Sequence, residues 1–331
     1  MKSGDNLSSL GKRLETDKVV NDAFWFEMTG KTTTQTTLQA GVYTLNLPAS
    51  KENILEQIKK QQPKPLPSTT AVSFLEGDTA EDVADKLDKS GIVKAEDFLK
   101  YIQDPANFKD SKYKFLPPVS NCKYGQILQN CPKYYLEGFL FPDTYEFYLN
   151  STPESVTEKF LSNFNQRIWG KQTTVSNADF YKNLILASVV EREVGRNYIK
   201  AMINETDLQT ERQAVAGVYL NRVSQSMKWQ ADPTVWYGVD RKKGVAVDGA
   251  LNWGDAKYKT GYNTYVITGY PVGPIANPGQ KSIEAALKPT PSNYIFFVSD
   301  KSGRMYFGET YAEHEKNIAK VREINKSLPN L

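Results

Sequence analysis

The sequence predicts an α+β protein in which two small βαα units precede a larger, mostly helical region with a β-hairpin. Three observations support this fold class. The first half contains a weak internal repeat, the second half becomes helical in pattern from about residue 152, and two strand-like segments flank a polar turn near the end. The length of 331 residues suits about two domains.

The two copies of the repeat are residues 3–30 and 76–102. Each copy reads as a Gly-Asp pair, a polar cap, a short amphipathic helix, a turn and a second short helix that carries phenylalanine. In the second copy, Asp78 or Thr79 is placed to cap the first helix, and Gly91 is placed to end it. Two unrelated helical hairpins are the alternative interpretation.

Strand-like segments accompany both copies. GVYTLNL, residues 41–47, follows the first copy, and TAVSF, residues 70–74, precedes the second. The proline-rich stretch at 63–68 reads as a linker between them. Further along, LEGFLFPDTYEFY at 136–148 predicts a turn packed beneath aromatic rings.

Two long helices are predicted in the second half. Ser176 and Asp179 have the spacing of a capping box, and the helix that they begin is expected to run to Val194, with Gly195 as its C-terminal cap. A second helix fits residues 208–226.

The C-terminal third combines loops, a hairpin and a final helix. Glycine- and proline-rich loops are expected at 229–281. IFFVSD and MYFGET, at 295–300 and 305–310, predict a β-hairpin, and a polar helix is expected from Tyr311. We therefore divide the chain into three regions, residues 1–66, 67–150 and 151–331.

Composition excludes several functions. The 41 basic and 38 acidic residues give a net charge of +3, so charge alone does not indicate a nucleic-acid-binding protein. His314 is the only histidine, which excludes a histidine-rich metal site, and a serine or cysteine triad would have to use it. We expect no metal and no cofactor.

Two further features concern the compartment. Cys122 and Cys131 lie on either side of a short segment and are either disulfide-bonded or two free thiols. No run of 18 or more apolar residues predicts a membrane-spanning helix, and the N-terminal residues lack the apolar core of a signal peptide.

One helical segment carries an unusual carboxylate. In LILASVVEREV, residues 184–194, Ser188 is the only polar residue before Glu191. On an ideal helix Glu191 shares a face with Leu184 and Ser188, whereas Glu193 lies about 200° away. Either the helix simply reaches solvent at Glu191, or this carboxyl is buried so that its pKa rises and it serves as a general acid.

Two loops combine amides, acids and aromatic rings. WQADPTVWYG, at 229–238, contains Gln230 and Asp232, and YNTYVITGYPVGPIANPG, at 262–279, contains Asn263, Tyr265 and Asn277. Such side chains suit a carbohydrate, which has hydroxyls at its edges and apolar faces. A buried Pro/Gly corner without a ligand is the alternative.

Six segments together resemble one family, the endolytic peptidoglycan transglycosylases (the MltG or YceG-like family). These segments are EGFLFPDTY, ASVVERE, VAGVYLNRV, QADPTVWYG, YNTYVITGYPVGPIANPG and YIFFVSDKSGRMYF, at 137–145, 187–193, 215–223, 230–238, 262–279 and 294–307. They follow the family's order, and together with the βαα units the resemblance covers nearly the whole chain. The resemblance implies that the βαα units are LysM-like and that the C-terminal region is a lysozyme-like catalytic domain.

The resemblance also implies a reaction and a site. The reaction is non-hydrolytic cleavage of the β-1,4 bond between N-acetylmuramic acid and N-acetylglucosamine, which leaves 1,6-anhydro ends and terminates strand elongation. Glu191 is expected to be the catalytic acid and base, and Glu193 is expected to point away from the site. Substrate is expected to contact Gln230, Asp232, Asn263, Tyr265 and Asn277, with Asn221 and Arg222 in a supporting role.

Two alternatives stay open. A two-carboxylate hydrolase would use Glu191 and Asp232, and a non-catalytic scaffold would bind glycan through its LysM-like units. The expected partners are glycan strands and peptidoglycan synthases, without nucleic acid. Because peptidoglycan lies outside the cytoplasmic membrane, an extracytoplasmic location with an N-terminal membrane anchor outside this sequence is expected.

Overall fold

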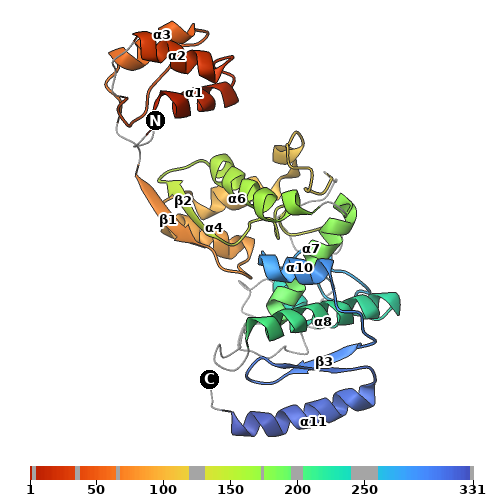
Figure 1. Ribbon diagram of the computed structural model, residues 1–331. Helices are drawn as coiled ribbons and strands as arrows, with labels where there is room; N and C mark the ends of the chain where they lie inside the picture. The colour runs from red at the N-terminus through yellow and green to blue at the C-terminus, as the bar shows by residue number, and fades with distance from the viewer. Residues whose placement is uncertain are drawn as a thin grey trace. The chain divides into compact units, whose positions relative to one another are not determined.

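The computed structural model describes residues 1, 5–33, 38–64, 68–118, 131–172, 175–194, 204–239 and 260–328. Its chain contacts divide it into two compact units, Met1–Thr69 and Thr70–Leu331. Figure 1 shows the elements of each unit. Among the described residues, no helix is long and apolar enough to cross a membrane.

The first unit is helical. Its helices are α1 (Leu7–Thr16), α2 (Ala23–Thr33) and α3 (Lys51–Lys60), and Asn6 caps α1 through a capping box with Ser9. Their apolar sides enclose a small core made of Leu10, Leu14, Val20, Phe26, Ile54, Leu55 and Ile58. The two short helices predicted at 3–30 are therefore present, and α3 is an additional helix that the sequence analysis did not identify.

The strand predicted at 41–47 is wrong. This segment forms only an isolated antiparallel bridge, between Val42 and Lys64. The reason lies on α3 and at its C-terminal cap, where two glutamine side chains take the place of a neighbouring strand. The Gln61 amide accepts from the Thr44 N–H at 3.0 Å and donates to its carbonyl at 2.7 Å, and Gln57 does the same for Asn46 at 2.7 and 3.2 Å. These amides satisfy the backbone without a β-ladder.

The second unit begins with a small sheet and two helices. Strand β1 (Thr69–Ser73) pairs with β2 (Thr144–Tyr148), and α4 (Ala80–Lys89) and α5 (Ala95–Gln103) follow β1 along the chain. Thr79 caps α4 through a capping box with Asp82, and Gly91 has a φ of +69° just after its end, as predicted. The short 3₁₀ helix η1 (Pro105–Phe108) comes next.

The remainder of this unit is mostly helical. In chain order it contains α6 (Pro153–Arg167), η2 (Trp169–Lys171), α7 (Asn177–Glu193), α8 (Glu205–Ser224), α9 (Asp232–Gly238), α10 (Gln280–Leu287), β3 (Phe296–Ser299), β4 (Met305–Gly308) and α11 (Tyr311–Ser327). β3 and β4 form the predicted antiparallel hairpin, with Phe297 opposite Phe307. The predicted ends of α7 and α8 are confirmed to within three residues, and α11 begins at Tyr311 as predicted. Helix α9 lies in the stretch that the sequence assigned to loops, and α10, which begins at the end of that stretch, was not predicted.

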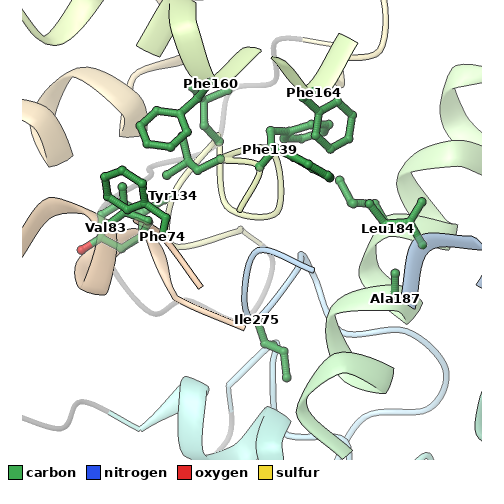
Figure 2. Packing of buried hydrophobic residues seen from close by; sticks show 14 of the residues in the cluster. Phe74, Val83, Tyr134, Phe139, Phe160, Phe164, Leu184, Ala187 and Ile275 are labelled. Carbon is green, nitrogen blue, oxygen red and sulfur yellow. The ribbon is translucent and has the colours of Figure 1, made fainter. Parts of the chain in front are cut away.

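One aromatic-rich core joins the elements of the second unit. Figure 2 shows part of it, with Val83 from α4, Phe160 and Phe164 from α6, Leu184 and Ala187 from α7, and Phe139 and Ile275 from loops. The rings of Phe139 and Phe164 lie 5.3 Å apart, edge to face, which is a favourable aromatic geometry. Buried side chains from 72–164 and from 180–305 thus belong to the same cluster.

The mixed α+β class is confirmed by these helices and small sheets. The division into regions 1–66, 67–150 and 151–331, like the LysM-like and lysozyme-like descriptions, stays a prediction. Cys131 is disulfide-bonded, and Cys122, the other cysteine of the sequence, lies outside the described residues, as does Gly195.

Candidate active site

Helix α7 carries both candidate glutamates at its C-terminal end. Ser176 begins the helix by accepting the Asp179 N–H at 3.2 Å, and its hydroxyl donates to the Asp179 carboxylate at 2.7 Å. Eight consecutive residues just before its end are all buried: Leu184, Ile185, Leu186, Ala187, Ser188, Val189, Val190 and Glu191. An apolar face therefore does not distinguish Glu191 from Glu193.

Glu191 is held inside the protein by backbone. Its side chain is 7% exposed, and its Oε2 accepts the N–H of Gly279, the residue that caps α10, at 3.0 Å. Gly77 lies against its Cγ, because a Cβ at this glycine would stand 3.7 Å away. Burial raises the pKa of Glu191, and the neighbouring Glu76 charge raises it further. Glu191 thus joins α7 to the start of α10.

Glu193 lies among different neighbours. The Tyr219 hydroxyl of α8 donates to its Oε1 at 2.9 Å, and its side chain is partly exposed. Burial raises the pKa of Glu193 to about 7, and the charge of Asp232 also raises it, while Tyr219 and Arg222 lower it. A carboxyl with this pKa is present in both protonation states near neutral pH, as a group that acts first as acid and then as base requires.

Asp232 and Tyr265 form a pair beside this carboxyl. The Tyr265 hydroxyl donates to Asp232 Oδ1 at 2.6 Å. The two segments that carry them are fastened at Thr264, whose hydroxyl accepts the Ala231 N–H at 3.0 Å and lies 2.8 Å from the Thr234 hydroxyl. Two of the residues predicted for substrate binding are therefore brought together.

Gln230 is the most exposed of the predicted substrate-binding residues. Its backbone has a φ of +52°, and its N–H donates to the Thr264 carbonyl at 3.1 Å. A left-handed backbone at a residue other than glycine costs free energy and is common at functional sites. The exposed side chain lies two residues before Asp232, at the start of α9.

Asn221 and Arg222 support this region from α8, consistent with the predicted supporting role. The Asn221 amide donates to the carbonyls of Ser292 and Tyr294 at 2.7 and 2.9 Å. Arg222 donates to the carbonyl of Ile295 at 2.7 Å and to that of Trp229. Both side chains thereby join α8 to the segment before β3, and Arg222 also fixes the start of the 229–238 loop.

The side-chain amides of Asn263 and Asn277 form hydrogen bonds within the protein. Both are buried, and Asn263 Oδ1 accepts the Tyr265 N–H at 3.0 Å within its own turn. Asn277 Oδ1 accepts the N–H groups of Gly138 and Leu140, both at 2.9 Å, and its Nδ2 donates to the Asp78 carbonyl at 2.9 Å. The prediction that these amides face substrate is not supported by their placement.

The two glutamates have different charged neighbours, and which of them is catalytic stays a prediction. Glu193 was expected to point away from the site, and it is the acid whose pKa responds to Asp232, whereas that of Glu191 responds to Glu76. The expectation assumed a helix with one buried face, whereas residues 184–191 of α7 are all buried. The uninterrupted apolar run from Leu184 to Val190 is the sequence signal that indicates such burial.

The sequence analysis missed one residue that contacts a candidate acid. Tyr219 appears there only within the VAGVYLNRV motif, without a role of its own. Across the described part of the chain, no three His, Cys, Asp or Glu side chains are arranged to hold a metal ion.

Most of this amino-acid sequence is shared with a known family of proteins. The chain belongs to the YceG-like family, which it matches over residues 1–320. It is similar to the endolytic murein transglycosylase of Streptococcus pneumoniae (strain D39), at 26% identity over 98% of this chain and 58% of the relative. The endolytic murein transglycosylase of Bacillus subtilis is 26% identical over 95% of this chain and 81% of that protein.

A solved structure is similar as well. The crystal structure of a YceG-like protein from Listeria monocytogenes shares 28% identity with this chain and superposes with a TM-score of 0.59, covering 96% of this chain and 97% of the other. The chain spans 58% of the length of the pneumococcal relative, so the activity of that whole protein is not transferred to this chain by similarity alone.

Proposed function

We propose that this protein is an endolytic lytic transglycosylase that cleaves the glycan strands of peptidoglycan, with Glu193 as its general acid and base. Membership of the YceG-like family and the names of the relatives support the class of reaction. The observation that carries the assignment of the acid is the Glu193 carboxyl with a pKa of about 7, beside the Asp232–Tyr265 pair.

The proposed reaction needs one carboxyl in two roles. Protonated Glu193 donates its proton to the oxygen that links N-acetylmuramic acid to N-acetylglucosamine, and the bond from that oxygen to the muramic C1 breaks. The resulting carboxylate takes the proton of the muramic C6 hydroxyl, whose oxygen closes on C1 to form the 1,6-anhydro ring. The internal hydroxyl replaces the water or second carboxylate of an ordinary glycosidase.

The neighbours of Glu193 suit both steps. Burial and the Asp232 charge favour the protonated form, which the first step uses. The Tyr219 hydroxyl and the Arg222 charge favour the carboxylate, which the second step uses. Gln230 is the exposed side chain best placed for contact with a sugar, and Asp232 serves to set the charge and to hold Tyr265.

Glu191 remains the alternative acid, as the sequence resemblance suggested, and two other functions compete. A hydrolase would use Glu191 or Glu193 together with Asp232 as its two carboxylates. The Asp232 charge raises the pKa of Glu193, so these two acids interact. A scaffold would bind glycan without cleaving it. These alternatives differ in their products, so one experiment separates them.

The experiment is mass analysis of the products from purified glycan strands. A lytic transglycosylase leaves anhydro-muramic ends, which are lighter by one water than the reducing ends left by a hydrolase. A scaffold leaves the strands intact. Strand-length analysis of the same samples tests endolytic action, because internal cuts shorten long strands before disaccharides accumulate. Reducing ends, or unchanged strands with a folded protein, would refute the proposal.

The setting of the reaction belongs to the same proposal. Peptidoglycan lies outside the cytoplasmic membrane, so we place the activity on the extracytoplasmic side. Termination of strand elongation, contact with peptidoglycan synthases and an anchor in the membrane are the finer expectations that follow from the family resemblance. Fractionation of cells that carry the complete gene product would test the location.

A further inference from the structure

Glu137 is a fully interior carboxyl outside the cluster around Glu193. Its side chain is 1% exposed, and it lies in the turn before β2. Its Oε1 accepts the Ala80 N–H at 2.9 Å and the Asn277 side-chain amide at 3.2 Å, while its Oε2 accepts the Tyr237 hydroxyl at 2.8 Å. One carboxyl thus binds the first residue of α4, the loop before α10, and helix α9.

Two of these contacts lead to the proposed active site. Tyr237 lies five residues after Asp232 on the same short helix. The Tyr237 ring meets the ring of Tyr262 edge to face, with centroids 4.7 Å apart, and Tyr262 lies three residues before Tyr265. The Tyr262 hydroxyl in turn accepts the Lys133 N–H at 2.9 Å, close to Glu137 in sequence. Both halves of the Asp232–Tyr265 pair are therefore connected to the turn that holds Glu137.

The groups hydrogen-bonded to Glu137 are donors, so the residue at position 137 has to supply acceptors. The Ala80 N–H and the Asn277 amide nitrogen can only donate, and the oxygen of the same Asn277 amide is already occupied by Gly138 and Leu140. A glutamine at position 137 would have to turn its own NH₂ toward Tyr237, because turning it the other way would oppose two donors. The bond to Tyr237 would then be reversed, with the tyrosine oxygen accepting from the NH₂.

Such a carboxyl is costly to bury, which argues for a specific role. Burial raises the pKa of Glu137, while the Tyr237 hydroxyl and the Ala80 N–H lower it again in part. The Glu137 carboxyl oxygens also face the N-terminus of α4, where acceptors and negative charge are favoured. A neutral apolar residue would fill the same space without these bonds.

We propose that Glu137 is a positioning residue, which holds Tyr237 and, through it, the start of α9, so that Asp232 and Tyr265 keep their place beside Glu193. This inference rests on the proposed function for its catalytic consequence, although its structural content does not depend on it. It predicts that the Glu137–Tyr237 bond and the Asp232–Tyr265 bond are energetically coupled, with no direct contact between them.

The first test measures this coupling without using activity. Tyr265→Phe removes the hydroxyl bound to Asp232, and its effect on the midpoint of urea unfolding is measured in the native background and in a Tyr237→Phe background. We expect a clearly smaller effect in the second, because α9 is no longer held. Additive effects would overturn the inference. Tyr306→Phe is the matched control, since its hydroxyl donates to Asp300 at 3.0 Å, and its background should leave the Tyr265→Phe effect unchanged.

The second test uses cleavage of glycan strands. Tyr237→Phe is expected to lower kcat by about tenfold with little change in KM, because it displaces groups that act on the acid and not the sugar contacts. Tyr306→Phe is expected to keep kcat. Glu137→Gln should retain more of kcat than Tyr237→Phe, because the Tyr237 oxygen can accept from its NH₂. Native kcat in a folded Tyr237→Phe variant would overturn the inference. An inactive wild type would refute the proposed function, and the unfolding test alone would then decide whether the two hydrogen bonds are coupled.

Discussion

Tyr219 donates its hydroxyl proton to Glu193 across 2.9 Å, and this bond joins the middle of α8 to the last residue of α7. The bond stabilises the carboxylate form of an acid that burial drives toward its protonated form. The two opposing effects leave the pKa of Glu193 at about 7. The predictions below follow from this balance and from the contacts that surround it.

Replacement of Glu193 by glutamine should abolish cleavage. Glutamine keeps the size of the side chain but cannot donate the proton to the leaving oxygen, so a loss of about 10²-fold or more is expected. Glu191→Gln is the matched control on the same helix, and it should act mainly on stability, because Glu191 accepts the Gly279 N–H. Initial rates on purified strands measure both. If Glu191→Gln is inactive and stable while Glu193→Gln cleaves, the original assignment to Glu191 is correct.

The rate should fall as the pH rises through about 7. The first step requires protonated Glu193, and deprotonation removes this form above its pKa of about 7. Tyr219→Phe removes a donor that favours the carboxylate, so the pKa should rise and the falling limb should move to higher pH. The measurement is kcat against pH, with circular dichroism at each pH to confirm the fold. A limb that does not move in Tyr219→Phe would indicate that another group titrates.

Replacement of Asp232 by asparagine should move the same limb in the opposite direction. The Asp232 charge raises the pKa of Glu193, so its removal should lower that pKa and move the falling limb to lower pH. We expect a reduced rate with anhydro products retained. Complete loss of cleavage, together with reducing ends in the wild-type products, would show that Asp232 is the second carboxylate of a hydrolase.

The sequence predicted most helices and the hairpin because their signals are local. The Ser176 cap, the Thr79 cap and the aromatic and β-branched residues of 295–300 and 305–310 each fix an element within a few residues. The segment at 41–47 was misassigned because its backbone partners are the side chains of Gln57 and Gln61, which lie on α3 and at its C-terminal cap, farther along the chain. Periodicity within a segment carries no information about such a partner.

The site was harder to predict than the fold. The loop motifs identified Asp232 and Tyr265 as neighbours, and the structure pairs them. The sequence favoured Glu191 over Glu193 from helix geometry alone, whereas the surroundings of each acid depend on partners distant in sequence, Gly279 for Glu191 and Tyr219 for Glu193. The loop motifs also did not show that the Asn277 amide is consumed by backbone groups from 78 and 138–140, far away in sequence.

Replacement of Asn277 by alanine should destabilise the protein without weakening substrate binding. The change leaves the buried N–H groups of Gly138 and Leu140 without an acceptor and removes one donor from Glu137, and each unsatisfied buried group costs about 1–3 kcal/mol. The midpoint of urea unfolding should therefore fall markedly. At a temperature where the variant is folded, KM for glycan strands should stay near the wild-type value. Gln230→Ala is the comparison, because its side chain is exposed and its loss should raise KM with little change in stability. A stable Asn277→Ala variant with a raised KM would return Asn277 to the substrate-binding residues.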